Sequence, residues 1–579
     1  MSNHHGMSTF QKLAELSAKM AGNRVYQDQG EELESLSPKD NVLARVARLF
    51  THEQPHEALA KFLGDEAERL SRSRSEALGV FGEADARKFL NWPQGFRLKW
   101  FCCWIERQFA EKLNHFGRLF SPGATPTPEP VLELLANQMN EGFGVPRGNI
   151  PLGFVFFGQF IDHDITFDAV TQLSDAGVTV ENVANLRSPT LDLDNVYRDG
   201  PEASPYLYDK DRGTGYLLTA NNGADLPRNA QSTALIGDPR NDENTFVSQL
   251  HLQFLHFHNG VLRLIENSNV DAVFGRIPGE HDFEFARRLC RWHYQWILVN
   301  EYLPLIVDSA PLAAAHSITG VPQGTTPPPP LDPMFSQAEF VLKSQSWTDC
   351  CGERRCGTMM PVEFSGAAFR FAHSQVPGRI DINDNARNLP IFVPSPPGPG
   401  AFTPAESQVD WRRFFAIDGS SPQMARPIDT FLDAQLFQLP FVPAGTPSSL
   451  ALRNLVRSEH VYRVPQVGVV AGALGLLPID ISLAATKQLS DAGITTTTEA
   501  PLWFAVLGEA AKNGGRLGKI GGLIVAWTLL NILRCDEESY VNASPAWSPV
   551  LNASTPGLFT MADLMRIAAS ERIDVSARP

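Results

Sequence analysis

The chain has few cysteines, few tyrosines and no excess of positive charge, and each scarcity argues against a class of protein. Seven cysteines in 579 residues are not the pattern of a small secreted scaffold held together by disulfides. The 49 Lys and Arg residues against 64 Asp and Glu residues give a net charge of −15. This balance argues against nucleic acid or an anionic membrane as the main partner. The 9 tyrosines contrast with 36 phenylalanines, a ratio that suits large apolar cavities.

Long apolar segments are also missing. The longest run, Leu523–Leu533, contains two polar residues and is too short to span a bilayer, so we expect a buried helix there and no transmembrane segment. Residues 1–20 lack a basic start followed by an apolar core, so no signal peptide is expected, and the compartment stays open between cytoplasm and leaderless export. Cys350, Cys351 and Cys356 cluster without a fourth ligand at zinc-ribbon spacing, which argues against a zinc site.

What the chain does have is helical periodicity interrupted by proline-rich loops. Residues 1–120 are charged and amphipathic, which predicts an N-terminal helical extension. Ser121–Pro128 has the composition of a linker, and later Pro-rich stretches predict surface loops within one large domain. Alternating apolar and polar residues, which indicate strands, are rare. We therefore predict a mainly α protein, with a helical extension at 1–120 and a single large domain with few short strands at 121–579.

The stretch Phe154–Phe167 is an almost unbroken apolar run that contains Gln159, Asp162, His163 and Asp164. Polar groups buried beside so many phenylalanines require partners. On a helix, Gln159 and His163 share one face because they are four residues apart, whereas the two aspartates point elsewhere. That face can serve a ligand. A lone histidine on an apolar helix is more often an ordinary core residue, so the interpretation depends on the rest of the chain.

A loop further along carries oxygen-bearing side chains at alternate positions, namely Ser188, Thr190, Asp192 and Asp194. A hard cation such as Ca²⁺ takes six to eight oxygen ligands, and this loop offers about four or five. Taken alone, such a loop is more often a solvated turn.

The segment Gly237–Phe246 predicts a helix start, with Asp238 as N-cap and Pro239 at the first helical position. Arg240 and Glu243 are three residues apart and share a face of that first turn. An exposed ion pair at a helix start would be worth at most about 1 kcal/mol. The predicted helix then buries one apolar face, formed by Phe246, Leu250, Phe254 and Val261.

Five motifs follow one another along the chain: Gly158–Asp164, Ser188–Asp194, Arg240–Glu243, Phe369–His373 and Asn454–Arg457. In this order they resemble the animal-type haem peroxidases of the peroxidase–cyclooxygenase superfamily, and in particular a bacterial-type member. The resemblance covers roughly residues 140–555. It implies a haem b cofactor held between a distal and a proximal histidine.

The resemblance assigns the distal side of the haem to three catalytic residues. His163 would be the distal base, which takes a proton from peroxide and returns it to the leaving oxygen. Arg240 would stabilise the departing hydroxide. Gln159, one turn from the histidine, would hold water or an anion.

Two carboxylates match family positions that form ester bonds to haem, namely Asp162 and Glu243. The next residue, Asn244, stands where the family's most chloride-competent members have methionine, so no sulfonium bond to haem is expected. The family pattern continues with a helix ending in His-Asn, which His258-Asn259 matches.

On the proximal side, the resemblance makes His373 the iron ligand. Arg370 would meet a haem propionate, Asn454 would accept the N–H of the proximal imidazole, and Arg457 would lie near a propionate. The residues after Arg457 depart from the family pattern. In the family's calcium site, the loop residues act together with the aspartate after the distal histidine, and the corresponding ligands here are Asp164, Ser188, Thr190, Asp192 and Asp194.

The function implied is a haem peroxidase that reduces hydrogen peroxide and oxidises organic donors, halides or thiocyanate through an oxyferryl intermediate. Two alternatives stay open, a fatty-acid dioxygenase of the same superfamily and a haem- or calcium-binding protein without turnover. The dioxygenases carry a radical-forming tyrosine three residues before the proximal histidine. Here that residue is Arg370, which favours the peroxidase.

Overall fold

The computed structural model describes residues 116–576, together with residues 66, 68–70 and 80. Short gaps in this range lie at 124, 142–147, 169–170, 176, 181–182, 269–270, 344–345, 349–353, 357–359, 393–407, 441, 443–445 and 552–556. The predicted N-terminal extension and the cysteines at 350 and 351 therefore fall almost entirely outside the described residues.

The chain divides into two compact units. The first consists of Met1–Phe116, Thr179–Ala184 and Ser344–Met359, and the second of Gly117–Val178, Asn185–Lys343 and Met360–Pro579. The predicted boundary at residue 120 stays a prediction. All the predicted site residues belong to the second unit, which is described from here on.

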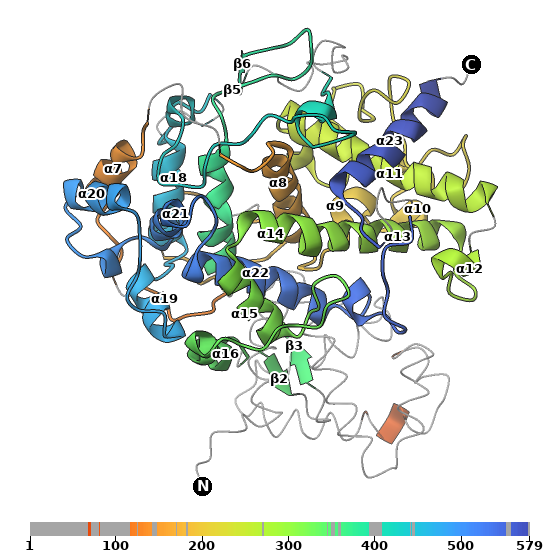
Figure 1. The fold of residues 1–579 in the computed structure, drawn as a ribbon. Helices are drawn as coiled ribbons and strands as arrows, with labels where there is room; N and C mark the ends of the chain where they lie inside the picture. The colour runs from red at the N-terminus through yellow and green to blue at the C-terminus, as the bar shows by residue number, and fades with distance from the viewer. Residues whose placement is uncertain are drawn as a thin grey trace. The chain divides into compact units, whose positions relative to one another are not determined.

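Helices dominate the described residues, and the predicted mainly α fold is confirmed (Figure 1). The α-helices are α7 (Glu129–Gln138), α8 (Gly153–Ile165), α9 (Asp194–Tyr197), α10 (Gly200–Ala203), α11 (Thr245–Asn267), α12 (Asp271–Phe274), α13 (Asp282–Ile297), α14 (Leu303–Ile306), α15 (Ser309–Thr319), α16 (Ser336–Lys343), α17 (Val362–Ser365), α18 (Leu450–Val456), α19 (Val467–Leu474), α20 (Leu483–Asp491), α21 (Leu502–Lys512), α22 (Lys519–Cys535) and α23 (Met561–Ser576).

Short segments of 3₁₀ helix and π-helix lie between these α-helices. The 3₁₀ segments are η3 (Pro205–Leu207), η4 (Pro239–Asp242), η6 (Pro333–Phe335), η7 (Ala368–Gln375), η9 (Trp411–Arg413), η10 (Ala434–Phe437), η12 (Thr497–Glu499) and η13 (Tyr540–Asn542), and the π segments are η5 (Leu298–Tyr302) and η11 (Arg457–Val461). The strands are β1 (Phe116–Gly117), β2 (Ser346–Thr348), β3 (Arg354–Cys356), β4 (Met360–Pro361), β5 (Arg379–Ile380) and β6 (Leu389–Pro390). Strands β2 and β3 pair antiparallel, as do β5 and β6.

Helix α8 contains the apolar run from the sequence and is buried along nearly its whole length. It packs on α11 through stacked rings, because Phe156 stacks on Phe246 and Phe160 on Phe254, with ring centroids 4.6 and 4.3 Å apart. Such pairs are worth about 0.5–1.5 kcal/mol each beyond their buried area. Packing of this kind, more than helix propensity, holds a helix that is rich in phenylalanine.

Two expectations for helices need correction, and one is confirmed. Asp238 caps the 3₁₀ turn η4 and not a long α-helix; α11 begins only at Thr245, where the side chain of Asn244 accepts from the N–H groups of Phe246 and Val247. Helix α11 then continues to Asn267, so the His-Asn pair at 258–259 lies inside the helix and not at its end. The predicted buried helix at Leu523–Leu533 lies in α22.

The predicted apolar face of α11 is buried at all four positions, which are Phe246, Leu250, Phe254 and Val261. Helices α11 and α23 pack together, as do α15 and α22. Among the described residues, no helix is both long and apolar enough to cross a membrane.

Candidate active site

A cavity of about 720 Å³ lies within the second unit. Its walls come from α8, the junction between η4 and α11, η5, η7, η10 and the start of α18. His163 and His373, which are 210 positions apart in the chain, both line it. One end of the wall is polar, whereas the segments around Ile391, Leu436 and Leu450 give it an apolar side.

His163 is fixed through only one of its ring nitrogens. Nδ1 lies 2.7 Å from the Oδ1 atom of Asn241, which is fully buried in η4. An amide oxygen only accepts, so Nδ1 carries the proton and Nε2 is left as the free nitrogen of the ring. Burial, and then the nearby charge of Arg240, lower the pKa of His163 to about 4. The imidazole is therefore neutral near pH 7, with a lone pair available.

His373 is held in a comparable way on another wall. Its Nδ1 atom lies 2.7 Å from the side-chain amide of Asn454 in α18. In the structure, the Nδ2 atom of that amide faces the ring. Rotating the amide by 180° presents its oxygen instead, and only then can Nδ1 donate and leave Nε2 free to bind a metal. Burial, and then Arg370, lower the pKa of His373 to about 3.

The segment before His373 is a 3₁₀ helix and not the α-helix expected for a proximal helix. Residues three apart in a 3₁₀ helix lie directly above one another. Arg370 and His373 are three apart in η7, and both line the cavity. The Nε atom of Arg370 donates to the carbonyl of Ser365, and burial, followed by the charge of Arg457, lowers the pKa of this arginine.

Beside His163, three polar side chains bond to one another. Gln159 donates through Nε2 to Glu243 and accepts through Oε1 from the Nδ2 atom of Asn244, 3.4 Å away. Burial raises the pKa of Glu243 to about 7. Asp162 also lines the cavity and accepts from the hydroxyl of Thr166 at 2.9 Å. The two predicted ester-forming carboxylates therefore share one cavity.

Arg240 binds the end of α8 and is absent from the described residues that line the cavity. Its catalytic role stays a prediction. Its Nη2 atom donates to the carbonyls of His163 and Thr166, at 3.1 and 2.6 Å, and to Asp238 at 2.7 Å. The guanidinium thus neutralises the carbonyl end of α8 and lies over the ring of Phe167.

The cations that face the cavity are Arg370 and Arg453. Arg457, which the sequence placed near a propionate, donates instead to the hydroxyl of Tyr462 at 3.3 Å and is absent from the described lining residues.

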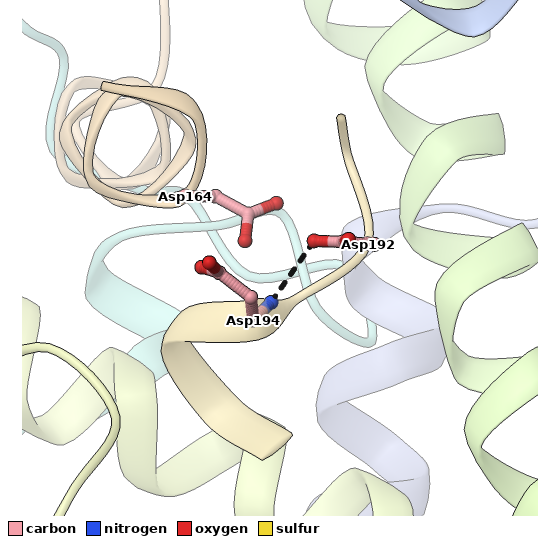
Figure 2. Close-up of side chains that lie close together, drawn as sticks. All are labelled: Asp164, Asp192 and Asp194. Atoms are coloured by element: carbon pink, nitrogen blue, oxygen red, sulfur yellow. Dashed lines mark hydrogen bonds between the residues drawn. The ribbon is translucent and has the colours of Figure 1, made fainter. Parts of the chain in front are cut away.

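Behind α8, three carboxylates converge. Figure 2 shows Asp164 reaching from α8 toward Asp192 and Asp194, and oxygen atoms of all three lie within 4.8 Å of one another. Burial and the two neighbouring aspartates raise the pKa of Asp164 well above its usual range, and burial and Asp192 raise that of Asp194 to about 7. No hydrogen bond of good geometry reaches the buried Oδ1 atom of Asp164 in the described part of the chain, although the nearby hydroxyl of Tyr294 acts to lower the pKa of this carboxyl. The positive charges of Arg187 and Arg291 act on Asp194 and Asp192.

The two hydroxyls of the loop adjoin this cluster. Ser188 and Thr190 are joined by a hydrogen bond of 2.5 Å, and Thr190 donates to Asp192 at 2.7 Å. Leu193 adopts a left-handed conformation with φ of 61°, which directs its N–H to Asp164 at 3.3 Å. A non-glycine residue in this conformation costs of order 1–3 kcal/mol and is often found at functional loops.

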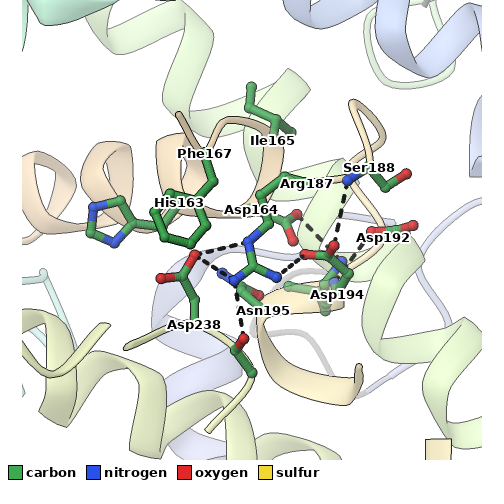
Figure 3. A network of polar contacts seen from close by, with 12 residues as sticks. His163, Asp164, Ile165, Phe167, Arg187, Ser188, Asp192, Asp194, Asn195 and Asp238 are labelled. Atoms are coloured by element: carbon green, nitrogen blue, oxygen red, sulfur yellow. Dashed lines mark hydrogen bonds and ion pairs between the residues drawn. The ribbon is translucent and has the colours of Figure 1, made fainter. Parts of the chain in front are cut away.

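Arg187 connects the three carboxylates to the distal side (Figure 3). It is 2 % exposed, pairs with Asp194 at 3.4 Å and with Asp238 at 2.8 Å, and its Nη2 atom donates to the carbonyl of Gly237. Because Asp238 also binds Arg240, two arginines share one buried carboxylate.

The sequence interpretation missed Asn241, Arg187, Tyr302 and Arg453. Asn241 and Arg187 lie in segments with no periodic pattern, and their burial becomes visible only in the fold. Arg453 gave a usable signal, because it directly precedes the motif Asn454–Arg457.

Comparison with known proteins finds a match to one protein family. Residues 175–396 match the family model for animal haem peroxidase. The matched segment contains Glu243 and His373, and α8 precedes it. The match covers less than half of the chain, and it identifies an animal haem peroxidase domain within it. The predicted bacterial type stays a prediction.

One solved structure shares the fold with a TM-score above 0.5, at low sequence identity. Peroxidase A from Dictyostelium discoideum superposes with a TM-score of 0.53 at 17% identity, over 79% of this chain and 94% of that chain. A fatty acid alpha-dioxygenase from Arabidopsis thaliana gives a TM-score of 0.48 at 14% identity, over 93% and 94%. The Oryza sativa enzyme gives 0.48 at 14%, over 89% and 95%. A search of curated protein sequences finds no match.

Proposed function

We propose that this protein is a haem peroxidase that reduces hydrogen peroxide and oxidises organic donors, halides or thiocyanate. One observation supports the proposal: the neutral imidazoles of buried His163 in α8 and partly buried His373 in η7 line one cavity, and the Nδ1 atom of each is engaged by an asparagine. One ring can then bind a metal while the other handles protons.

The residues present fit haem. His373 would bind the iron through Nε2, with the amide of Asn454 turned so that its oxygen accepts from Nδ1, a bond that fixes the ligand and strengthens its donation. Arg370 and Arg453 would meet the two propionates, since they are the cations that line the cavity. When bound, the haem supplies the electrons that break the O–O bond of peroxide.

The protein's part in that step is proton handling at Nε2 of His163. The atom takes the proton from peroxide and returns it to the departing oxygen, while Nδ1 keeps its own proton in a hydrogen bond to Oδ1 of Asn241. Because the pKa is lowered to about 4, the base is unprotonated before peroxide enters. The amide groups of Gln159 and Asn244 offer donors and acceptors for the entering molecule.

Arg240 has a positioning role in this proposal. It binds the carbonyl of His163 itself and the carbonyl of Thr166 just after α8. It therefore fixes the end of the helix that presents the base, and its charge keeps that base neutral.

A calcium ion would complete the loop behind α8. The buried Oδ1 atom of Asp164, the convergence of three carboxylates, and the adjoining hydroxyls of Ser188 and Thr190 match a hard cation that prefers oxygen ligands. Arg187 shares its charge between Asp194 and Asp238, and Arg291 shares its charge between Asp192 and Asp536.

Ester bonds to haem through Asp162 and Glu243 are the second part of the cofactor proposal. Both carboxylates line the cavity. Denaturing mass spectrometry after extended peroxide treatment should find haem mass on peptides containing one or both residues, and Asp162→Asn with Glu243→Gln should abolish it. Haem that is entirely free after treatment would refute the ester bonds but not the peroxidase.

The overall proposal is tested with the absorption spectrum of the purified protein. We expect a Soret band that changes on adding peroxide, followed by turnover of guaiacol and iodide. A fatty-acid dioxygenase would instead consume oxygen with a long-chain fatty acid, and a binding protein would show the band without turnover. Either result would overturn the assignment.

A further inference from the structure

Asn241 lies between two imidazoles. Its Oδ1 atom accepts from Nδ1 of His163 at 2.7 Å, and its Nδ2 atom donates to Nδ1 of His251 at 3.0 Å. All three side chains are buried, and Asn241 and His251 are fully so. Asn241 lies in η4, and His251 lies ten positions later in the second turn of α11.

A single amide in this position couples the proton positions of the two rings. It has one accepting end and one donating end, so one histidine must donate through Nδ1 while the other must accept there. A neutral imidazole carries one proton. The two rings therefore hold opposite tautomers, and rotating the amide by 180° would exchange them.

Only one of the two arrangements suits a base. With Asn241 as the acceptor, Nε2 of His163 is bare and can receive a proton from a molecule in the cavity. With the amide reversed, Nε2 would already carry a hydrogen and could accept nothing. The tautomer matters through the whole cycle, because Nδ1 keeps its proton while Nε2 gains and loses one.

His251 is well placed to bias this choice. It touches no cavity wall among the described residues, its ring meets Phe160 edge to face, and its Nε2 atom has no hydrogen-bond partner in the described part of the chain. Nothing but Asn241 engages the ring by a hydrogen bond there. Burial lowers the pKa of His251 to about 3, so the ring stays neutral and keeps a lone pair for Asn241.

We propose that Asn241 and His251 are positioning residues that together hold His163 in the tautomer with an unprotonated Nε2. This inference rests on the proposed function for its purpose. Its geometric content, the opposite tautomers of two buried histidines, is testable without catalysis.

The first test reads the tautomers directly. Full-length protein without haem, labelled with ¹⁵N-histidine, is compared by NMR with the His163→Ala and His251→Ala variants, which assign the two rings by loss of signal. We expect a proton on Nδ1 of His163 and on Nε2 of His251. A proton on Nε2 of His163, or the same tautomer in both rings, would overturn the proposal.

The second test breaks the coupling with Asn241→Asp. A carboxylate accepts at both ends, so His163 should keep its Nδ1 proton while His251 moves its proton from Nε2 to Nδ1. If the His251 signals do not change, the amide does not couple the rings. The variant is close in size to asparagine, and circular dichroism checks that it folds.

The third test is kinetic and uses the haem-loaded protein. His251→Leu should slow the reaction with peroxide by about tenfold, less than the roughly hundredfold or more expected for loss of the base itself. His251→Gln should recover most of the rate, because its side-chain oxygen can accept from Nδ2. The matched control is His256→Leu, a buried histidine on the same helix whose Nε2 bonds the carbonyl of Gly223; it should leave the rate unchanged.

The outcomes separate the two proposals. Opposite tautomers without any peroxide turnover would refute the peroxidase and leave the coupled pair standing. Turnover that is equally fast in His251→Leu, His251→Gln and His256→Leu would refute the positioning role and leave the peroxidase standing.

Discussion

At the scale of single residues, His163 differs from an ordinary core histidine in where its free ring nitrogen lies. One nitrogen is bound in the core and the other is free in a ring that lines a cavity. A core histidine such as His293 has both nitrogens engaged, since Nδ1 bonds Leu289 and Nε2 accepts from the backbone of Val550 and Leu551. The difference explains why burial produces a base in one case and a structural bond in the other.

Replacing His163 tests this reading. His163→Ala should slow peroxide-driven oxidation by roughly a hundredfold or more, because proton transfer by a placed base is lost. The Soret band should persist, since His373 is untouched. Stopped-flow absorbance measures the reaction, and normal rates in the variant would remove His163 from the mechanism.

Gly158 is a second residue whose identity the site requires. A Cβ atom at this position would collide with the hydroxyl of Tyr302, which also lines the cavity. Gly158→Ala should therefore destabilise the protein by about 1–3 kcal/mol, the usual cost of overpacking, and weaken haem retention. Combining it with Tyr302→Phe removes the colliding atom and should recover most of the loss.

The control for this pair is Gly472→Ala in α19. A Cβ atom there would meet only the side chain of Leu477 at 4.0 Å, so the change should be neutral or stabilising by up to about 1 kcal/mol. Thermal unfolding and haem titration are measured for Gly158→Ala, for its combination with Tyr302→Phe, and for Gly472→Ala. Equal effects at the two glycines would contradict the steric explanation.

At the scale of secondary-structure elements, α8 has two functional sides. His163 faces the cavity, while the next residue, Asp164, faces the loop that leads into α9. Successive residues on a helix point about 100° apart, so adjacent positions serve different sites. A cation at the loop would thus fix the orientation of the helix that presents the base.

Calcium removal should show this coupling with a defined pH dependence. Burial, and then the charge of Asp192, raise the pKa of Asp194 to about 7, so without a cation Asp194 is mostly protonated at pH 5 and mostly ionised inside the acidic cluster at pH 8. A chelator should lower Tm at pH 8 more than at pH 5, with about 1 °C for each kcal/mol lost in a chain of this length.

Asp192→Asn provides the control for the chelator experiment. It removes one carboxylate of the cluster, so the variant should bind calcium more weakly. At pH 8 the chelator should therefore lower the Tm of this variant much less than that of the wild type. Differential scanning calorimetry measures each case. A chelator effect of the same size in wild type and variant would contradict a cation at this cluster.

At the scale of the whole molecule, buried carboxylates tie separate helices together. Glu509 of α21 accepts from the N–H groups of Ile520 and Gly521 at the start of α22, and Glu301 accepts from Met561 at the start of α23. Glu363 accepts from Leu119 and Phe120 in the same manner. Each joins segments distant in the chain and places a carboxyl group in the interior.

These groups predict how stability changes with pH. Burial raises the pKa of Glu301, Glu363 and Glu509 to about 7 each, from an ordinary value of 4.5. The folded state then binds protons more tightly than the unfolded state. The contribution is fully present below pH 4.5 and is lost as pH rises through 7, by about 3 kcal/mol per group at most.

Urea unfolding in saturating calcium, at pH 5 and pH 8, measures this fall. Glu509→Gln removes one titrating group and should flatten the profile between those values. Glu339→Gln, at a half-exposed position of α16 that pairs with Lys343, should leave the slope unchanged. An equal slope in all three proteins would show that the buried carboxyls do not set it.

The sequence by itself determined the class of fold, the helix that carries His163, the segment that carries His373, and the cluster of acidic residues near Asp194. These depend on local spacing and on the order of motifs, which a linear chain displays. It could not determine the 3₁₀ conformation of η7, the late start of α11 at Thr245, or the position at which an arginine side chain ends.

Only the tertiary structure decided that Arg240 binds the end of α8, that Arg453 faces the cavity where Arg457 does not, and that Asn241 lies between two imidazoles. Long polar side chains have several rotamers of similar energy, and burial makes each lost hydrogen bond costly. Their directions are therefore fixed by partners that come from distant parts of the chain.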